Sequence, residues 1–502
     1  MKKNRILFLF SLVLSALFIG LASKSSPLYP LNDWVDVNCF FTMGRSMLDG
    51  FVPYRDLYEQ KGPVLYFVYA IISLFSRDSF VGVYLLEVIT YGLFLYFSGK
   101  VAQLYLGKSL FVFLIVAVLA ALLPVSWSFT HGGSVEQNCL FMLVYGMYSV
   151  LRALREKRGL RFYEAFVNGI FAAIILWSKY TALGFYLGLA LFVLIWYVFV
   201  PELRGKLMLT IGQFLLGIVA VSSIVFLYFG INNAIDDLFT VYFYNNIVLY
   251  PAKVDGSRLD AIWMCLKTAV SSNQSYGWMI HAGLFWFVFQ LRNQWRSALM
   301  AALCFAGLTL GTYWGGRGYD YYGFIFAAFC VFGLIILAQA LQFSRVPQRL
   351  FSLFSDSWVT RGFALALSML LLFMWTLPSH HNLYLSRIDK DSTVQYRFAE
   401  KIQTVENPTL LNYGFLDGGF YFAADAKPVC RYFCYFNINS QEMWDEQRKC
   451  IENGDADFIV TRQYKLTQYT VDHSKYQLVD TAEHPFDKYY KYTYYLYQKI
   501  SD

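Results

Sequence analysis

Long apolar runs, spaced along most of the chain, constrain this sequence more than any other feature. A helix needs about 20 mainly apolar residues to cross a bilayer, and fewer when it packs among other helices. By that rule the sequence predicts eleven membrane helices, at residues 6–22, 80–98, 109–125, 137–152, 162–178, 181–199, 207–228, 276–291, 297–313, 322–342 and 362–378. Only 15% of the residues are charged, against about 25% in soluble domains. We therefore expect a polytopic α-helical membrane protein with about 11 transmembrane helices.

The basic residues gather in every second loop between these runs. Under the positive-inside rule, loops rich in Lys and Arg face the cytoplasm. Four clusters are therefore expected there: Arg152, Arg155, Lys157, Arg158 and Arg161; Arg204 and Lys206; Arg292 and Arg296; and Arg345, Arg349 and Arg361. The net charge of +7 thus reflects topology rather than a nucleic-acid-binding face.

The N-terminus joins the basic stretch MKKNR to an apolar run, as a secretory signal does. Cleavage after Ala22 is one interpretation, and an uncleaved anchor is favoured because so many spans follow. Either version delivers residue 24 to the outer side. With Lys100 and Lys108 inside, the short run 62–75 is expected to stay outside as a re-entrant or interfacial segment. If it crosses instead, a neighbouring helix must be broken.

The apolar pattern ends at residue 379. Strand-like segments, PTLLNYG, DFIVTRQ and YYLYQK, then alternate with polar helical stretches such as INSQEMWDEQRKCIENG. This alternation predicts a small α/β domain, which the helix count places outside the membrane. The sequence thus divides into a membrane module at 1–378 and an extracytoplasmic domain at 379–502.

The eight cysteines form no CxxC pair and no Cys/His spacing typical of zinc. Cys430, Cys434 and Cys450 share the C-terminal domain, where three free thiols are favoured over one disulfide. No Gly-rich phosphate loop is present either. No cofactor is therefore firmly predicted, and a divalent metal stays open.

The first external loop, residues 24–62, carries the most informative pattern. Four of its residues recur at helical spacing: Asp36, Phe40, Met43 and Met47. This spacing predicts a helix along the membrane surface, with a carboxylate at its start and Gly50 at its end. For Asp33 and Asp36, taken singly, helix capping is the alternative role.

A second structured piece follows in the same loop. Pro53 and Tyr54 begin it, and Lys61 directly precedes Gly62-Pro63, where the chain returns to lipid.

The run from Asp36 through Arg45, Met47-Leu48, Gly50, Pro53-Tyr54 and Lys61-Gly62-Pro63 resembles the first external loop of the GT-C glycosyltransferases. It is most similar to the family 39 branch, with the protein O-mannosyltransferases and the lipid A aminoarabinose transferase. In that branch the loop begins with an acidic motif, usually Asp-Glu, and ends with Lys-Pro-Pro or His-Pro-Pro. This chain departs twice, with Val37 at the second acid and Gly62 at the first proline. The helix count and the C-terminal domain extend the resemblance loosely over the rest of the chain.

The resemblance implies a GT-C fold and inverting transfer of a sugar from a polyprenyl-phosphate donor. It implies that Asp36 is the catalytic base and that Lys61 meets the lipid phosphate. It also raises Glu136, in THGGSVEQN, from a helix-capping residue to a second catalytic acid that orients the acceptor or assists the base. Such a transfer needs a base for the acceptor proton and cations for the departing phosphate.

Further candidates lie in the external loops. The cations expected to contact the donor phosphate, besides Lys61, are Lys179 in WSKYTALGF, Arg317 in WGGRGYDYYGF, and Arg45. Snorkelling is the alternative for Lys179, and pairing with Arg317 is the alternative for Asp320. The residues expected to bind sugar or acceptor are Asp33, Tyr54, Tyr244, Asn245, Tyr319, Asp320 and Tyr322. Interfacial anchoring explains the aromatic residues equally well, and Glu87, inside a span, has no assigned role.

These features favour a glycosyltransferase that adds a sugar to a cell-envelope glycan, lipid or protein on the outer face. A transporter or flippase of a lipid-linked sugar would share the membrane body, but would show paired charges within spans or broken helices in matching halves. A receptor or assembly protein would bind through its C-terminal domain instead. The expected partners are membrane lipid, the donor and the acceptor, without nucleic acid, and the short basic N-terminus suits a bacterial plasma membrane.

Overall fold

The computed structural model describes residues 2–107, 109–251, 257–273, 276–343, 358–438, 440–485 and 490–500. Lys108, Arg345 and Arg349, which support the predicted topology, lie outside the described residues. The chain forms two compact units. Unit 1 comprises Met1–Ser23, Tyr84–Ser223 and Ala252–Asn382, and unit 2 comprises Lys24–Val83, Ile224–Pro251 and Leu383–Asp502. The predicted boundary at residue 378 separates a membrane module from an extracytoplasmic domain, and it stays a prediction.

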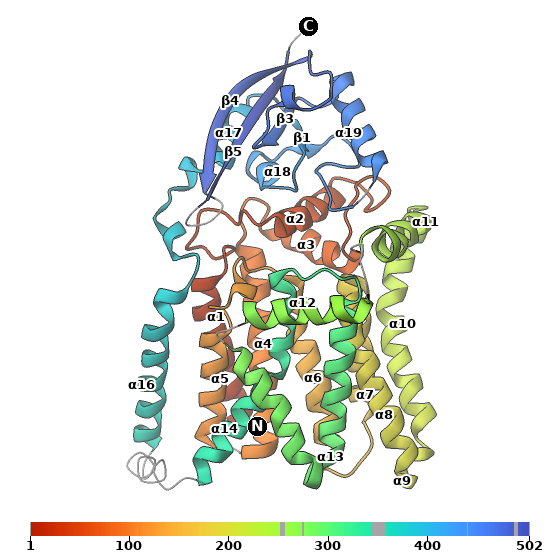
Figure 1. Ribbon diagram of the computed structural model, residues 1–502, viewed down its shortest axis with the longest axis vertical. Helices are drawn as coiled ribbons and strands as arrows, with labels where there is room; N and C mark the ends of the chain where they lie inside the picture. Colours follow the sequence, from red (N-terminus) through yellow and green to blue (C-terminus); the bar gives the residue numbers. More distant parts are fainter. Residues whose placement is uncertain are drawn as a thin grey trace. The chain divides into compact units, whose positions relative to one another are not determined.

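Unit 1 is built from long apolar helices that lie side by side (Figure 1). Its helices are α1 (Lys2–Ala22), α4 (Val81–Leu106), α5 (Leu110–Leu122), α6 (Val135–Arg155), α7 (Phe162–Lys179), α8 (Gly184–Phe199), α9 (Pro201–Arg204), α10 (Leu207–Ile231), α12 (Arg258–Ser272), α13 (Gly277–Tyr313), α14 (Cys330–Phe343) and α16 (Trp358–Thr376). The last residues of α10 belong to unit 2. Helix α12 runs across the ends of the long helices (Figure 1).

Every predicted apolar run lies in helical structure. Two of the predicted runs fall in α13, which is interrupted at Gln294, where the backbone leaves the helical conformation with φ −141° and ψ 44°. The run at 322–342 begins in the 3-10 helix η4 (Asp320–Phe329) and continues in α14. The apolar runs therefore predicted where helices form.

Five helical segments of the described residues are long and apolar enough to cross a membrane: Asn4–Ala22, Val81–Leu106, Phe162–Phe199, Leu207–Ile231 and Asp320–Gln342. Shorter apolar helices lie at Pro63–Phe75, Leu110–Leu122 and Leu365–Ser379. The chain is therefore a multi-pass membrane protein, and the count of about eleven crossings stays a prediction.

The short run at 62–75 forms helix α3 (Pro63–Phe75) of 13 residues. At 1.5 Å per residue it extends about 20 Å, short of the about 30 Å hydrocarbon core. Helix α5 is equally short, but the two helices differ in their neighbours. α5 contacts α1, α14 and α16 within unit 1, whereas α3 packs against α2 (Val35–Leu48) within unit 2. That this segment stays on one side of the membrane remains a prediction.

Glycines allow α8 and α13 to approach closely. A Cβ atom added at Gly184 would lie 2.1 Å from the carbonyl oxygen of Gly307, and one added at Gly311 would lie 2.2 Å from the carbonyl oxygen of Thr181. Larger side chains at these positions would force the helices apart. Small residues at helix contacts are the usual means of association in membranes, where apolar burial alone gives little driving force.

The first external loop begins unit 2 and contains the predicted surface helix. Helix α2 spans Val35–Leu48, with Asp36 in its first turn. Gly50 follows with φ +94°, a left-handed conformation that glycine adopts most readily and that ends helices. The predicted start and end of this helix are confirmed.

Residues 224–251 contribute a second part of unit 2. They comprise the end of α10, the short helix α11 (Ile235–Asp237) and the π-helix η3 (Leu238–Leu249). π-Helical turns are rare and occur often at functional sites.

The C-terminal part of unit 2 is a five-stranded sheet with the order β2-β1-β3-β5-β4. Its strands are β1 (Thr409–Tyr413), β2 (Lys427–Pro428), β3 (Phe458–Arg462), β4 (Tyr476–Pro485) and β5 (Lys491–Lys499). β1 runs parallel to β2 and β3, whereas β5 runs antiparallel to β3 and β4. The three predicted strand segments correspond to β1, β3 and β5, so the small α/β domain is confirmed.

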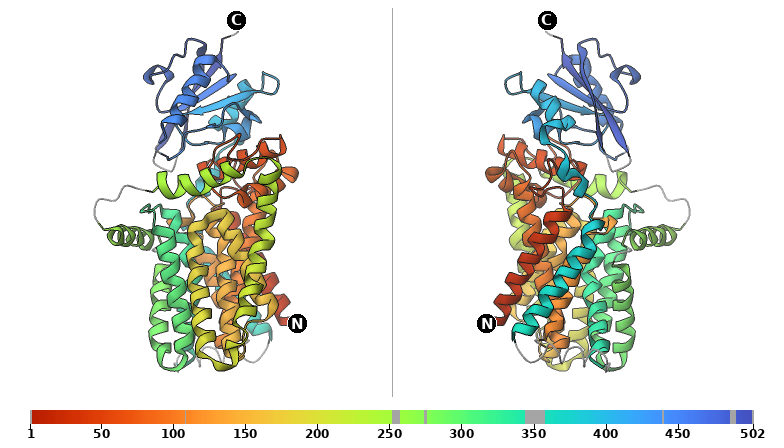
Figure 2. Two further views of the ribbon diagram at one scale, coloured as in Figure 1. Left: turned by 90° about the vertical axis from the view of Figure 1, so that its right-hand side faces the viewer. Right: turned by 90° about the vertical axis from the view of Figure 1, so that its left-hand side faces the viewer.

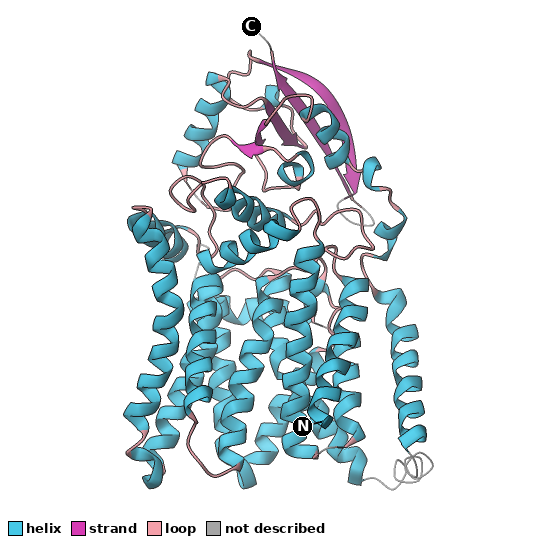
Figure 3. Ribbon diagram, turned by 180° about the vertical axis from the view of Figure 1, so that it is seen from behind, coloured by secondary structure: helices cyan, strands magenta, loops and turns pink. Residues whose placement is uncertain are grey.

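Helices accompany this sheet: α17 (Val394–Ile402), α18 (Phe420–Ala424) and α19 (Gln441–Asn453). Cys450 and Ile451 of α19 form a buried apolar cluster with Leu411 of β1 and Ile459 of β3. Figure 2 gives two views of the sheet with its helices, and Figure 3 shows its strands in magenta. All eight cysteines lie among the described residues, and all are free thiols.

Candidate functional site

Asp36 and Lys61, the two residues singled out in the first external loop, form an ion pair in unit 2. The Nζ atom of Lys61 lies 3.5 Å from Oδ2 of Asp36. Their side chains remain 19% and 17% exposed, so water or a ligand can reach both charges. The ammonium group also lies 5.4 Å from the ring centroid of Phe40, one turn along α2 from Asp36.

The backbone of Lys61 is held by two side chains of its own loop and one of the following helix α3. Tyr54 and Tyr66 both donate their hydroxyl groups to the carbonyl oxygen of Lys61. The carboxylate of Glu59 accepts the Lys61 N–H at 2.8 Å and also the Tyr66 hydroxyl. Tyr54 has φ +71°, an uncommon conformation for a residue other than glycine. These buried contacts fix the point from which the Lys61 side chain extends.

Two other parts of unit 2 contact the same loop. Asn246 of η3 donates to the carbonyl oxygen of Gln60 at 2.7 Å. Arg431 donates from Nε to the carbonyl oxygen of Tyr54 at 3.0 Å and accepts the Tyr58 N–H at its own carbonyl oxygen. Residues distant in the sequence thus stabilise the loop that carries Lys61.

The predicted sugar-binding residues of this unit have different surroundings. Tyr54 is buried, and its hydroxyl is used within the loop. Tyr244, on η3, is exposed, and its neighbour Asn245 donates to the hydroxyl of Tyr58 at 3.4 Å. Sugar binding by these residues stays a prediction.

Asp33 lies in an ion network rather than in a helix cap. Its carboxylate is 2.6 Å from Nζ of Lys24 and 3.1 Å from Nε2 of His484 on β4. Burial alone would raise its pKa, but the charges and hydrogen bonds of Lys24 and His484 hold the pKa of Asp33 well below its usual value. The network ties the first external loop to the C-terminal sheet within unit 2.

Arg45 is not part of the Asp36–Lys61 pair. It lies nine residues after Asp36 on α2, which corresponds to about 14 Å along the helix. Its guanidinium pairs with Asp425 and donates to the carbonyl oxygens of Tyr421 and Phe422. Burial, and then the neighbouring charge of Arg77, lowers the pKa of Arg45 to about 10. These contacts give Arg45 a structural role, and its predicted contact with the donor phosphate stays untested.

Glu136 and Lys179, predicted from separate loops, form an ion pair in unit 1. Glu136 lies in the first turn of α6, and Lys179 is the last residue of α7. Their side chains are only 1% and 7% exposed. The ammonium group of Lys179 also lies 3.7 Å from the ring centroid of Tyr322. The predicted residues Glu136, Lys179 and Tyr322 are therefore brought together, with the charges enclosed.

The segment around Arg317 also lies in unit 1. Arg317 donates to the hydroxyl of Tyr319 at 3.1 Å, and Asp320 accepts a hydrogen bond from Ser272 at 2.6 Å. The rings of Tyr319 and Tyr322 meet edge to face. Arg317 and Tyr319 are half-buried and Asp320 is exposed, so this segment is accessible to a ligand.

The structure supplies a role for Glu87, which lies in α4 of unit 1. Its carboxylate accepts hydrogen bonds from Ser23 and from the N–H of Gly133. Gly132 has φ +77°, and a Cβ atom there would lie 2.1 Å from Oγ of Ser23. Glu87 therefore fixes the tight turn that precedes Glu136.

Sequence reasoning missed Glu59, Tyr66 and Asn246, which position Lys61. Each contributes a hydrogen bond to the backbone, a contact that leaves no recognisable spacing in the sequence. Among the described residues, no group of three or more His, Cys, Asp or Glu side chains is placed to hold a metal ion. The Asp36–Lys61 arrangement offers a base for a hydroxyl proton beside a cation for an anionic leaving group.

No protein-family model and no curated protein matches the sequence. Solved structures match the fold. ArnT from Cupriavidus metallidurans bound to undecaprenyl phosphate matches with a TM-score of 0.59 at 14% identity, over 98% of this chain and 97% of that chain. Its apo state matches with the same values.

A second solved protein shares the architecture over a smaller part of its length. Archaeal oligosaccharyltransferase AglB from Archaeoglobus fulgidus, in complex with an inhibitory peptide and a dolichol-phosphate, has a TM-score of 0.52 at 12% identity. The match covers 90% of this chain and 69% of that chain. The chain therefore has the GT-C fold that the first external loop predicted.

Proposed function

We propose, from the GT-C fold together with the Asp36–Lys61 pair, that this chain is a membrane glycosyltransferase. It transfers a sugar from a polyprenyl-phosphate-linked donor to a glycan, lipid or protein acceptor of the cell envelope. The observation that carries the proposal is the 3.5 Å separation between Lys61 Nζ and Asp36 Oδ2. The structures of ArnT and AglB hold undecaprenyl phosphate and dolichol-phosphate, which supports a donor of this class.

In the proposed reaction, an acceptor hydroxyl attacks the anomeric carbon of the sugar. Asp36 takes the hydroxyl proton, and the bond between the anomeric carbon and the phosphate oxygen breaks, so that polyprenyl phosphate leaves with the bonding electrons. Attack opposite the leaving group inverts the anomeric carbon. The positive charge of Lys61 stabilises the negative charge on the departing phosphate. In the resting protein the same ammonium group faces the carboxylate of Asp36.

The alternation of basic loops supports the topology of the proposal. With Arg152, Arg158 and Arg161 in the cytoplasm, about eleven crossings place the N-terminus inside and residues 379–502 outside. The reaction then takes place on the outer face of a plasma membrane, which we propose to be bacterial. Phosphate binding by Lys179 and Arg317, catalysis by Glu136 and any requirement for a divalent metal are separate proposals.

The test is sugar transfer by the purified full chain in lipid vesicles, with a panel of radiolabelled polyprenyl-phosphate sugars and cell-envelope acceptors. Asp36→Asn keeps the size of the side chain but removes the base, so transfer is expected to fall by about 10²- to 10⁴-fold. Asp78→Asn, at an exposed carboxylate of unit 2, is the matched control and keeps full activity. Lys61→Arg retains a cation and is expected to keep more activity than Lys61→Ala.

Folding of each variant is checked by its thermal unfolding midpoint in detergent. Full transfer by a folded Asp36→Asn variant would exclude Asp36 as the base. Movement of the donor across the bilayer without transfer to any acceptor would instead identify a flippase. Addition of EDTA to the same assay tests the requirement for a metal.

A further inference from the structure

A polar cavity of about 740 Å³ lies in unit 1 at the end where α1 begins and α4 and α6 finish. Its size falls within the range of about 300–1,000 Å³ that is usual for small-molecule sites. Ten residues line it: Asn4, Tyr96, Phe97, Lys100, Gln103, Leu104, Gly107, Tyr148, Arg152 and Glu156. None of them belongs to the proposed glycosyltransferase site.

The cavity changes character along one face of α4. Tyr96 and Phe97 line it one turn before Lys100, and Gln103 and Gly107 follow at helical spacing. α4 is long and apolar enough to cross a membrane, so the lysine stands near its end. An aromatic inner part and a basic outer part match a ligand that is apolar at one end and anionic at the other.

Two cations line the cavity. Lys100 donates to Gln103 at 3.1 Å and to Asn4 at 3.4 Å, and its ammonium group lies 5.8 Å from the ring centroid of Tyr148. Arg152 donates from Nε to Glu156 at 2.8 Å. Its remaining guanidinium N–H groups are suited to bidentate contact with a phosphate.

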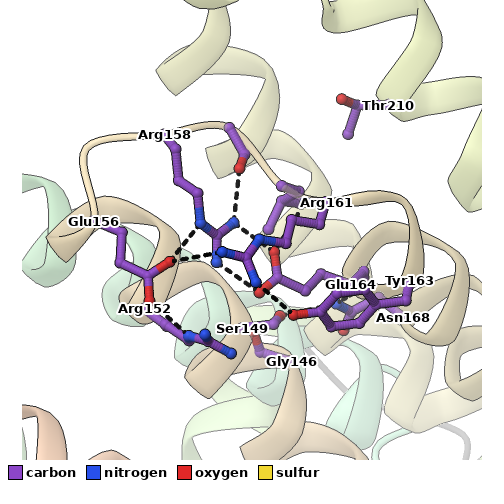
Figure 4. A network of polar contacts seen from close by, with 12 residues as sticks. Gly146, Ser149, Arg152, Glu156, Arg158, Arg161, Tyr163, Glu164, Asn168 and Thr210 are labelled. Atoms are coloured by element: carbon purple, nitrogen blue, oxygen red, sulfur yellow. Dashed lines mark hydrogen bonds and ion pairs between the residues drawn. The ribbon is translucent and has the colours of Figure 1, made fainter.

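The basic loop next to the cavity contains more positive than negative side chains. Glu156 is shared by Arg152, Arg158 and Arg161, and Arg158 also pairs with Glu164 (Figure 4). Between residues 152 and 164 the chain carries five cations and only two carboxylates. The network therefore neutralises its acids and keeps a net positive charge that attracts an anion.

We propose that this cavity binds the headgroup of an anionic phospholipid. Lys100 and Arg152 contact the phosphodiester, Asn4 and Gln103 hydrogen-bond the polar headgroup, and Tyr96 and Phe97 contact the start of the acyl chains. Basic pockets between transmembrane helices bind such headgroups at the cytoplasmic surface. The site is separate from the proposed transfer reaction and does not depend on it.

The test follows the thermal unfolding midpoint of the delipidated full chain during titration with short-chain phosphatidylglycerol. Wild type is expected to be stabilised in a saturable manner. Lys100→Gln loses a charge-assisted contact, so its half-saturating lipid concentration is expected to rise by about tenfold or more. Lys100→Arg keeps the charge and is expected to bind nearly as well as wild type.

Lys157→Gln is the matched control, since it removes an equal charge from an exposed residue that lies in the neighbouring basic loop after α6 and does not line the cavity. Phosphatidylcholine of the same chain length and inorganic phosphate are expected to have no effect. An equal response of Lys100→Gln and wild type, or an equal response to phosphatidylcholine, would overturn the proposal. Stabilisation by inorganic phosphate alone would identify a soluble phosphate compound as the ligand instead.

If Lys100→Gln does not fold, Arg152→Gln provides the same comparison, because Glu156 keeps its ion pairs with Arg158 and Arg161.

Discussion

The pair Asp36–Lys61 in unit 2 and the pair Glu136–Lys179 in unit 1 combine the same two kinds of charge in different surroundings. In each, the acid is the second residue of a helix. The first pair is separated by 3.5 Å with both side chains nearly one-fifth exposed, whereas the second is in close contact and almost fully buried. The charges of the first pair are partly exposed and remain open to water. The buried pair depends on its internal partner for stability, because an unpaired charge there would lack solvent.

The largest effect is expected from breaking the buried pair. Lys179→Ala leaves the carboxylate of Glu136 unpaired in the interior, which should lower the free energy of unfolding by about 3–5 kcal/mol. The thermal or denaturant midpoint of the purified protein measures this loss. The double variant with Glu136→Ala removes the orphan charge and should recover part of it. A single variant as stable as wild type would show that the pair is not buried as described.

The next effect sharpens the comparison within unit 2, where Asp33 is a second partly buried carboxylate, held by Lys24 and His484. Its pKa is lower in the folded protein than its usual value of 3.8, so its stabilising contribution is present above that pH and is lost as the pH falls through the folded pKa. Asp33→Asn should cost about 2 kcal/mol at neutral pH. The difference from wild type should shrink below pH 3.8, as unfolding midpoints recorded against pH will measure. A difference that is constant with pH would contradict the Lys24–Asp33–His484 network.

A smaller effect is expected from Tyr66→Phe, which removes a hydrogen bond to the Lys61 backbone but leaves the Tyr54 bond. The expected result is about a 5- to 10-fold loss in kcat/KM, with a loss of about 1 kcal/mol in the free energy of unfolding because the buried carboxylate of Glu59 also loses the Tyr66 hydroxyl. Tyr464→Phe, at an exposed tyrosine of unit 2, is the control. Unchanged kcat/KM in Tyr66→Phe would mean that Lys61 does not need this support.

The smallest effect on stability is expected from Lys61→Ala, although the same variant should lose transfer activity. Partly exposed ion pairs contribute about 1 kcal/mol or less, and Asp36 keeps the favourable field of the α2 N-terminus. The unfolding midpoint should therefore stay close to that of wild type. A loss as large as that of Lys179→Ala would remove the distinction between the two pairs.

The sequence predicted the parts of the fold that depend on local pattern. Apolar runs predicted the helices, Gly50 predicted the end of α2, and three β-branched or aromatic segments predicted β1, β3 and β5. It also predicted that Asp36 and Lys61 share a site, because a family pattern places them in one loop. These features lie within short stretches of chain.

Features that depend on distant segments were not predictable. The contacts of Asn246 and Arg431 with the Lys61 loop join residues separated by more than one hundred positions. The predicted contact of Arg45 with the donor phosphate stays untested, and its ion pair joins it to Asp425, a residue near the other end of the chain. Spacing and residue type do not reveal such partners, since only the folded chain brings them together.

Unit 2 is assembled from three separate stretches of chain, and this has a consequence for biosynthesis. Strand β5 follows β3 and β4 along the chain and lies between them in the sheet. The sheet can close only after β5 has been synthesised. Because Arg431 and His484 support the first external loop, a nascent chain that already contains Asp36 and Lys61 still lacks part of their framework. The framework around Asp36 and Lys61 is therefore complete only after the residues up to β5 have been synthesised.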